Sequence, residues 1–498
     1  MLPLETNGSE DLMTDLFTYI DGHQDEFVQS LKEWIAIPSD SSDPLLRKEL
    51  IKMVEITAER IQALGATVEL IDMGQEQLND GQSVPFPKAI LAQLGNDPSK
   101  ATICFYGHVD VQPAKMEDGW ITDPYNMTER NENLYGRGAT DNKGPVLAWI
   151  NAVDTYKALN QEIPVNIKFI IEGVEETGSQ GLEDLIKGNS SFFSDVDYIV
   201  ISDNVRLSRK PALTYGTRGD AYFFVEVQSG TKDLHSGTFG GIIHESMRDL
   251  VYLLANLVDS SGHILIPGIY DDVSPLTEEE RKLYDDIDFD LEEHQNNSGV
   301  NTFLYSTKEE ILQHLWRYPC LSIHGIEGAF SGYGSKTVIP GKVIGKFSIR
   351  LVPDMKIPVV NKQVINHLKS VFAKLKSPNK LVVTLQIGAL PWIANVNDLQ
   401  YEAARNAIRK VTPEMIRDGS TIPLARIFQD LTKKSIMMLP IGGADDGEHS
   451  QNEKISRSNY IQGTKIFASF FLELAKLHKD LQMNNDPLTI KTSQQNGS

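Results

Sequence analysis

The sequence predicts an α/β protein with a doubly wound, mostly parallel sheet and an inserted, smaller α+β domain. Three observations predict this fold. Apolar, β-branched runs alternate with helical patterns over residues 1–214. Near residue 215 the pattern changes to alternating, half-exposed strands. From about residue 389 the α/β pattern resumes, so residues 215–388 form an insert between two parts of one domain, 1–214 and 389–498.

The first domain begins with apolar residues at helical spacing over residues 10–35 and 44–64. Residues 144–159 predict a further helix, with Pro145 in its first turn and Asp141 just upstream. Four apolar runs predict buried strands: KAILAQL (88–94), ATICFY (101–106), VNIKFII (165–171) and VDYIVIS (196–202).

In the insert, residues 221–228 and 341–353 alternate as half-exposed strands, and helices are expected around 245–257 and 360–373. The segment 271–294, DDVSPLTEEERKLYDDIDFDLEEH, is strongly acidic and is expected to form a solvated helical insert without chemistry. After the insert we expect a strand at 435–441 and a helix at 459–478. A polar tail after about residue 481 is expected to be disordered.

The composition excludes several classes of function. Lys and Arg total 47 against 68 Asp and Glu, which gives a formal net charge of −21. Such a surface repels phosphate backbones and anionic lipid, so we expect neither nucleic acid nor membrane as a partner. Cys104 and Cys320 are isolated and make neither a disulfide framework nor a thiolate metal site.

The N-terminal residues show no basic leader and no apolar segment of signal-peptide length. A cytoplasmic protein is therefore expected. The alternative is a secreted protein whose leader is missing, and the Asn-x-Ser/Thr sequons would then be glycosylation sites.

Titratable side chains follow the predicted strands. Ligands of an open α/β sheet bind beyond the carboxyl ends of its strands, so these side chains should meet at one edge. They are His108, Glu175 with Glu176, Asp203 and His449, joined by Asp141 in a glycine-rich loop before a helix. Each alone has another explanation: a core histidine, a solvated loop, a turn or a charge at a helix N-terminus. Together, two histidines and several carboxylates predict a two-metal hydrolytic site.

Charge and geometry suggest roles for these residues. Two divalent ions about 3.5–4 Å apart need a bridging carboxylate. Asp141 is the best candidate because glycines in its loop permit unusual backbone angles. Of the adjacent Glu175 and Glu176, one should bind metal and the other should accept a proton from the attacking water. Asp110 should hold His108 through the ring nitrogen that the metal does not use.

Seven motifs, in order, resemble the co-catalytic metallopeptidase family of carnosine dipeptidase, aminoacylase and glutamate carboxypeptidase, and within it the carnosinase branch. They are GHVDVQPA, LYGRGATDNKG, EGVEETGS, ISDN, DLHSGTFGG, TVIPGKVIGKFSIRLVP and DDGEHSQNE. The resemblance spans about residues 15–478. It implies two divalent ions per subunit, zinc with manganese or cobalt as substitutes. It also implies that Asp141 bridges them, that His108 and Asp203 complete one site and Glu176 and His449 the other, and that Glu175 is the general base.

The resemblance further implies that the insert is a lid and a homodimerisation domain, with His235 acting in the partner's site. It places Thr337 and Arg350 on the substrate carboxylate and Gly419, Ser420 and Thr421 in a substrate-binding loop. From the residues alone, a surface salt bridge would also explain Arg350, and an ordinary loop histidine would explain His235. An arginine fork nevertheless suits a carboxylate, and a histidine donor suits a developing oxyanion.

We therefore expect hydrolysis of small Xaa-His dipeptides such as anserine (an Xaa-methyl-His dipeptide), carnosine and homocarnosine. The alternatives are a broad-specificity cytosolic dipeptidase and an N-acyl-amino-acid hydrolase; a silent homologue conflicts with the complete ligand set. Leu390 departs from the branch pattern, which has a basic residue or histidine before Pro-Trp. Leu390 either favours a methylated imidazole in the substrate or only packs beneath the hinge.

Overall fold

The computed structural model describes residues 6–77, 81, 83–408 and 412–485, and the chain divides into two compact units. Unit 1 comprises residues up to Tyr215 together with Ala394–Ile416 and the chain from Ile427 onward. Unit 2 comprises Gly216–Ile393 and Arg417–Arg426. The sequence placed the boundaries at 214/215 and 388/389 and assigned the short segment 417–426 to the first domain, whereas the structure groups that segment with unit 2.

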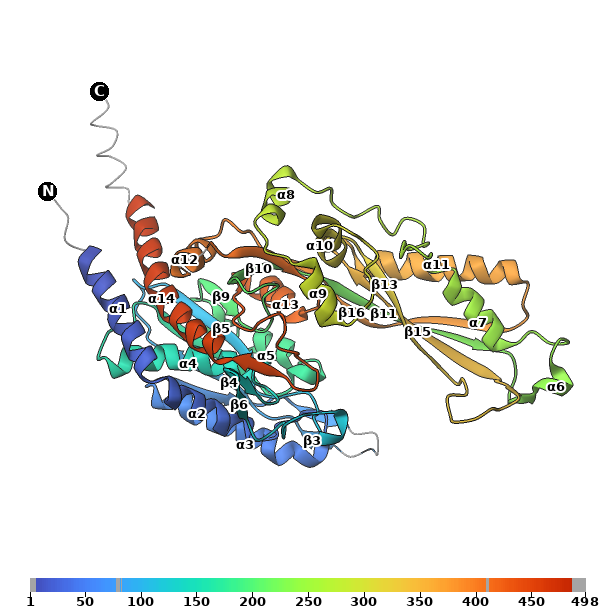
Figure 1. The fold of residues 1–498 in the computed structure, drawn as a ribbon, viewed down its shortest axis with the longest axis horizontal. Coiled ribbons are helices and arrows are strands. Elements are labelled where there is room, and N and C mark those ends of the chain that lie inside the picture. The colour runs from blue at the N-terminus through green and yellow to red at the C-terminus, as the bar shows by residue number, and fades with distance from the viewer. Residues whose placement is uncertain (1–5, 78–80, 82, 409–411, 486–498) are drawn as a thin grey trace, which may run out of the picture. The chain divides into compact units, whose positions relative to one another are not determined.

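Unit 1 is built on a mixed sheet in which β1, β4, β8, β5, β9, β19 and β10 are neighbours in that order. Figure 1 labels β4, β5, β9 and β10 of this sheet. The central strands β8, β5, β9 and β19 run parallel, whereas β4 and β10 on their flanks are antiparallel to them. The α/β class is confirmed, with parallel pairing confined to the centre of the sheet. The strands are β1 Thr67–Ile71, β4 Ala89–Leu94, β5 Thr102–His108, β8 Asn166–Glu172, β9 Tyr198–Ile201, β10 Ala212–Thr217 and β19 Ser435–Met438.

Helices cover both faces of this sheet, as a doubly wound fold requires. Neighbouring residues of β5 point to opposite faces. Phe105 packs against Trp149 of α4, with ring centroids 3.7 Å apart, whereas Tyr106 packs against Phe428 of α13 at 5.4 Å. The helices of unit 1 are α1 Thr6–Gly22, α2 Gln24–Ile35, α3 Arg47–Ala63, α4 Lys143–Ala158, α5 Leu182–Gly188, α12 Leu399–Ala407, α13 Pro423–Thr432 (from Ile427 onward) and α14 Arg457–Asn485.

Short elements complete unit 1. Among the described residues, four 3-10 helices and two small sheets connect the main elements, and β18 pairs with β10. They are η1 Pro44–Leu46, η2 Met116–Asp118, η3 Glu175–Thr177, η4 Ser190–Phe193, β2 Gln75–Gln77, β3 Ser83–Pro85, β6 Thr128–Arg130, β7 Asn133–Tyr135, β18 Glu414–Asp418 (up to Ile416) and β20 Lys454–Ser456.

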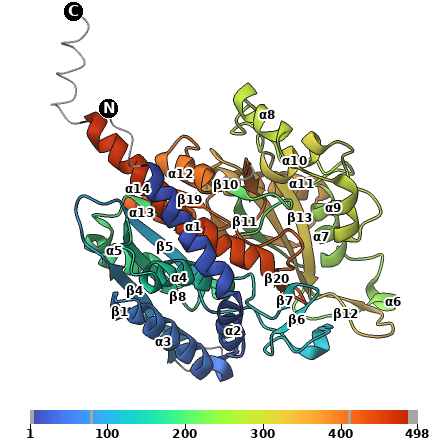
Figure 2. The ribbon, with the colours of Figure 1, turned by 60° about the vertical axis from the view of Figure 1, so that its left-hand side comes forward.

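Two differences from the sequence prediction concern the ends of the chain. The helical pattern over 10–35 forms two helices, because α1 ends at Gly22 and α2 begins at Gln24. The last helix, α14, continues to Asn485, so it includes the start of the polar tail. The rest of that tail, residues 486–498, lies outside the described residues. Figure 2 shows α1 and α14 side by side, and the two helices are in contact.

Unit 2 contains an antiparallel sheet in the order β13, β15, β11, β16. Residues of β11 alternate between buried and half-exposed along its whole length, as predicted for an α+β insert. The buried face packs under α7 and α11, and Phe223 stacks on Phe347 with centroids 5.2 Å apart. The strands are β11 Gly219–Gln228, β12 Leu234–His235, β13 Cys320–Glu327, β14 Val338–Ile339, β15 Lys342–Leu351, β16 Lys380–Ala389 and β17 Trp392–Ile393.

The acidic segment of unit 2 is not simply solvated, which corrects the expectation from its composition. It forms α8 and α9, and Tyr284 and Ile287 are only 1% and 2% exposed. These two apolar residues of the acidic run are buried in unit 2, and Tyr284 packs against Trp316. The helices of unit 2 are α6 Ser236–Phe239, α7 Ser246–Ala255, α8 Glu278–Asp285, α9 Leu291–Ser298, α10 Lys308–Trp316 and α11 Ile357–Leu375.

Within the described ranges, none of the helices combines the length and the apolar character needed to cross a membrane.

Candidate metal centre

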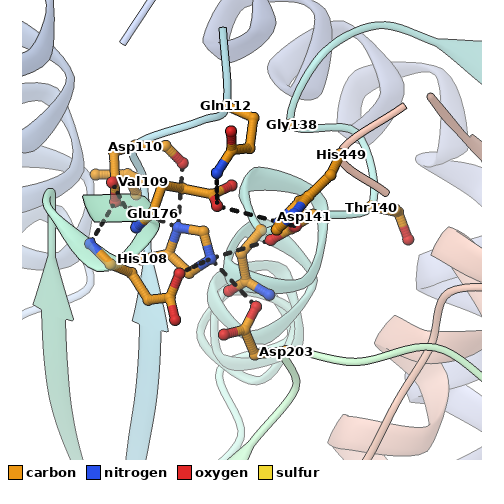
Figure 3. Close-up of polar contacts among 12 residues, drawn as sticks. His108, Val109, Asp110, Gln112, Gly138, Thr140, Asp141, Glu176, Asp203 and His449 are labelled. Carbon is orange, nitrogen blue, oxygen red and sulfur yellow. Dashed lines mark hydrogen bonds and ion pairs between the residues drawn. The ribbon is translucent and has the colours of Figure 1, made fainter. Parts of the chain in front are cut away.

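The carboxyl ends of the parallel strands bring titratable side chains together in unit 1 (Figure 3). His108 is the last residue of β5, and Asp203 lies two residues beyond the end of β9. Glu175 and Glu176 form the turn η3 just after β8, and His449 lies in the loop that follows β19. Because parallel strands end at the same edge of a sheet, residues far apart in the sequence become neighbours.

His108 and two aspartates make the first group of possible metal ligands. The Nε2 atom of His108 lies 3.1 Å from Oδ1 of Asp141 and 3.2 Å from Oδ1 of Asp203. The His108 side chain is completely buried. Its Nε2 also lies 3.9 Å from Oε2 of Glu175. The ring nitrogen and the carboxylate oxygens therefore converge on one small space.

Asp141 also belongs to a second group, with Glu176 and His449. The Nε2 atom of His449 lies 2.9 Å from Oδ2 of Asp141 and 3.1 Å from Oε2 of Glu176. The two oxygens of Asp141 thus face different histidines, Oδ1 toward His108 and Oδ2 toward His449. A carboxylate in this position is suited to bridge two cations.

The negative charge of the carboxylates in this site favours bound cations. Burial raises the pKa of Asp203, and it raises that of Glu176 with Asp141 reinforcing the shift. Burial lowers the pKa of His108, but the surrounding aspartates raise it well above its ordinary value. Hydrogen bonds to Asp141 and Glu176 raise the pKa of His449 to about 11. Carboxylates crowded around imidazoles in this way suit a divalent cation, and oxygen and imidazole donors without thiolates suit zinc or manganese.

Asp110 orients both His108 and the glutamate turn. The Nδ1 atom of His108 lies 3.1 Å from the Asp110 carbonyl oxygen and 3.3 Å from its carboxylate. The same carboxylate accepts the backbone N–H groups of Glu175 and Glu176 at 3.2 and 3.0 Å. Asp110 therefore leaves Nε2 of His108 facing the other ligands, and it acts through its neighbours.

Sequence reasoning missed Glu453, which is completely buried and accepts four hydrogen bonds. Its Oε1 accepts the N–H groups of Thr140 and Asp141, both at 3.0 Å. Its Oε2 accepts the N–H of Gly138 at 3.0 Å and Nη1 of Arg137 at 2.8 Å. Burial raises the pKa of Glu453 to about 7, and Arg137 opposes the shift. Since the partners are all donors, Glu453 fits this place as a carboxylate and fixes the Asp141 loop.

Gln112 is the second missed residue, and its Nε2 donates to Oε2 of Glu176 at 2.9 Å. Both residues lie in motifs quoted from the sequence: Glu453 ends DDGEHSQNE, four residues after His449, and Gln112 lies in GHVDVQPA, four residues after His108. Neither spacing indicates which groups the side chain hydrogen-bonds in the folded chain.

Two backbone features shape the loops that carry the ligands. His449 has φ +58°, a left-handed conformation that a non-glycine residue adopts at a cost of about 1–3 kcal/mol and that is enriched at functional sites. Gly144, in the first turn of α4, permits a close approach to the loop before it. A Cβ at this position would lie 2.0 Å from the carbonyl oxygen of Ala139, so only glycine fits.

The other predicted site residues lie in unit 2, where they form two pairs. Nη1 of Arg350, on β15, donates to Oγ1 of Thr421 at 2.5 Å, and Gly419 and Ser420 belong to the same loop as Thr421. His235 and Thr337 are brought together by the pairing of β12 with β14, in which the N–H of Ser236 donates to the Thr337 carbonyl at 3.1 Å. Leu390 is half-buried between β16 and β17. Their roles stay predictions.

The comparisons with known proteins agree on one family. Residues 104–473 match the profile of peptidase family M20/M25/M40. Rat "Beta-Ala-His dipeptidase" is 64% identical over 475 residues, which cover 94% of this chain and 96% of the relative. "Cys-Gly metallodipeptidase dug1" of Schizosaccharomyces pombe is 46% identical over 468 residues, 93% of this chain and 98% of the relative. The crystal structure of human carnosine dipeptidase 1 matches with a TM-score of 0.86 and 63% identity, over 93% of this chain and 99% of that one.

The contacts of Asp110 predict that Asp110→Asn weakens metal binding. Asparagine keeps one accepting oxygen and has an amide nitrogen in place of the other, so either the Glu175 or the Glu176 N–H group loses its acceptor. The turn and the His108 ring should then be held less firmly. We expect the affinity for zinc to fall roughly 10–100-fold. Equilibrium dialysis of the apoprotein measures it. Asp118→Asn is the matched control, since Asp118 is exposed and accepts only the Lys115 N–H in η2. Equal zinc affinity for Asp110→Asn and the wild type would refute this role.

Proposed function

The chain belongs to peptidase family M20/M25/M40 and is a metallodipeptidase, and we propose that it hydrolyses small Xaa-His dipeptides with two divalent ions, most simply zinc, bound in unit 1. One observation carries the proposal: the two oxygens of Asp141 face two separate histidine-carboxylate groups. His108 and Asp203 would hold one ion with Asp141, and Glu176 and His449 would hold the other.

The bound ions would supply positive charge that polarises the scissile carbonyl and the attacking water. Glu175 is the residue best placed to move protons. Burial raises its pKa well above the ordinary value, with His108 opposing and Asp203 reinforcing the shift. A carboxyl group with a raised pKa accepts a proton from water and returns it to the leaving amine more readily than an ordinary glutamate. Glu176 is engaged by His449 and Gln112, which separates the roles of the two glutamates.

Residues of unit 2 supply the features that a dipeptide needs. Arg350, linked to Thr421, offers a planar donor for the substrate's terminal carboxylate. Nδ1 of His235 accepts the Gly237 N–H at 3.0 Å, so its proton resides on Nε2 when the ring is neutral. Nε2 is then a donor for the oxyanion that forms during amide hydrolysis. We propose that His235 does this in the site of a partner subunit, within a homodimer formed through unit 2.

The names of the relatives support this substrate class. The names of the mammalian relatives specify Beta-Ala-His dipeptides, and those of the yeast relatives Cys-Gly dipeptides. The higher identity of the former favours Xaa-His substrates such as carnosine and homocarnosine. Leu390 further favours anserine, because a leucine contact gains from the added methyl group of the imidazole, worth up to about 0.8 kcal/mol. A broader dipeptidase is the second candidate, and the Cys-Gly relatives support it.

A chelator and a substrate panel test this function together. Dialysis against a strong chelator should abolish hydrolysis of carnosine and anserine, and added zinc, cobalt or manganese should restore it. In the restored enzyme, kcat/KM should rank anserine above carnosine, and both above Cys-Gly and an N-acetyl amino acid. Full activity without metal would contradict the metal chemistry. A preference for Cys-Gly or for the N-acetyl amino acid would favour the broader dipeptidase or an acyl-amino-acid hydrolase.

Glu175→Gln tests the assignment of the base. The amide cannot accept a proton, so turnover should fall by about 10²–10⁴-fold while the bound metal, measured by elemental analysis, remains. Mixing this variant with His235→Ala under conditions of subunit exchange should restore activity, because one site of the heterodimer then has both residues. Loss of metal in Glu175→Gln would make Glu175 a ligand. Demonstrated exchange without recovery would place His235 outside the partner's site.

A further inference from the structure

Unit 2 contains a buried charge cluster in which one carboxylate serves two arginines. Oε1 of Glu280 lies 2.5 Å from Nη2 of Arg417, and its Oε2 pairs with Nη1 of Arg317. The three side chains are 12%, 7% and 6% exposed. Arg317 also donates from Nη2 to the Ser274 carbonyl at 2.6 Å. Removing one partner of an ion pair this well shielded from solvent leaves an uncompensated buried charge. The loss therefore costs more free energy than breaking an exposed surface pair.

Glu280 reaches this position because its helix is docked. Its N–H donates to Oγ1 of Thr277, which caps the start of α8. One turn further on, Tyr284 packs against Trp316 at the end of α10, with ring centroids 5.9 Å apart, and both rings are buried. The two helices can be followed in Figure 1. The acidic segment therefore presents a single glutamate inward while its other acidic residues remain outside.

Arg417 lies near the end of β18, and the segment 417–421, here called the loop 417–421, continues from it through Gly419 and Ser420 to Thr421. This segment is held from several sides. Arg218 donates from Nε to the Gly419 carbonyl at 2.9 Å and from its backbone N–H to the Ser420 carbonyl at 3.0 Å. Gly419 lies against α10, because a Cβ there would meet Cδ1 of Leu315 at 2.9 Å. At the end of the loop, Thr421 receives the hydrogen bond of Arg350.

We propose that Glu280 is a positioning residue for substrate binding: by clamping Arg417 to Arg317 it fixes the loop 417–421 and thereby holds Thr421 and Arg350 in place for a substrate carboxylate. The inference rests on the proposed function, which gives Arg350 its role. Without Glu280, two buried guanidinium groups would lose their shared carboxylate and repel each other. A shift of Arg417 at the end of β18 would relieve that repulsion, and Thr421, four residues further on, would shift with it.

Glu280→Gln tests the proposal, with Glu278→Gln as the matched control. Glu278 lies in the same turn of α8, but it is 70% exposed and pairs only loosely with Arg281, at 3.8 Å. In Glu280→Gln we expect KM for carnosine to rise about tenfold, with a smaller change in kcat and unchanged metal content. Carnosine amide, which lacks the carboxylate, should keep its inhibition constant as a competitive ligand. Glu278→Gln should match the wild type throughout.

The possible outcomes distinguish a failure of the proposed function from a failure of the role of Glu280 alone. A wild-type enzyme that hydrolyses no dipeptide would overturn the proposed function, and this inference with it. An active wild type and a Glu280→Gln variant with unchanged KM, or with equal losses for carnosine and its amide, would overturn the inference alone. Should thermal melting show Glu280→Gln unfolded at the assay temperature, Arg417→Lys replaces it. Lysine keeps the charge but loses the fork, so the same selective rise in KM is expected, and its absence would count against the proposal.

Discussion

Negative charge concentrated at the carboxyl ends of the central strands is the constraint on which the rest of unit 1 depends. Asp110, Asp141, Glu175, Glu176 and Asp203 gather around His108, which is completely buried. Carboxylates so close together and away from water repel one another unless cations are bound between them. Burial raises the pKa of Glu175, Glu176 and Asp203, and the neighbouring carboxylates reinforce these shifts.

The fold holds this charge in place by surrounding it with donors. Glu453 gathers the N–H groups of the Asp141 loop, and Thr140 donates to Asp446 at 3.0 Å, which ties the same loop to the segment carrying His449. Lys454 donates to Asp446, also at 3.0 Å. One buried network therefore ties Asp141 to the segment that carries His449, so a shift of either would disturb the other.

Much of the site was predictable from the sequence, because a strand followed by a titratable residue is a local pattern. His108 ends a strand, Glu175, Glu176, Asp203 and His449 follow strands, and the rule about strand ends places them together. Glu453 was not predictable, because its partners lie more than 300 residues away and only the folded chain brings them into contact. The prediction for the segment 271–294 was incomplete, because its eleven acidic residues indicated a fully solvated segment. The composition did not show that one of them, Glu280, faces inward. The fold class was predictable from strand–helix alternation, but the antiparallel flanks of the sheet were not, because pairing direction depends on contacts between distant strands.

Anomalous diffraction from crystals of the zinc-loaded protein tests the central claim most directly. Data collected at the zinc edge should show two peaks per chain, about 3.5–4 Å apart, with Asp141 between them. One peak should lie beside His108 and Asp203 and the other beside Glu176 and His449. A single peak, or peaks that Asp141 does not bridge, would contradict a dinuclear site built on the shared carboxylate.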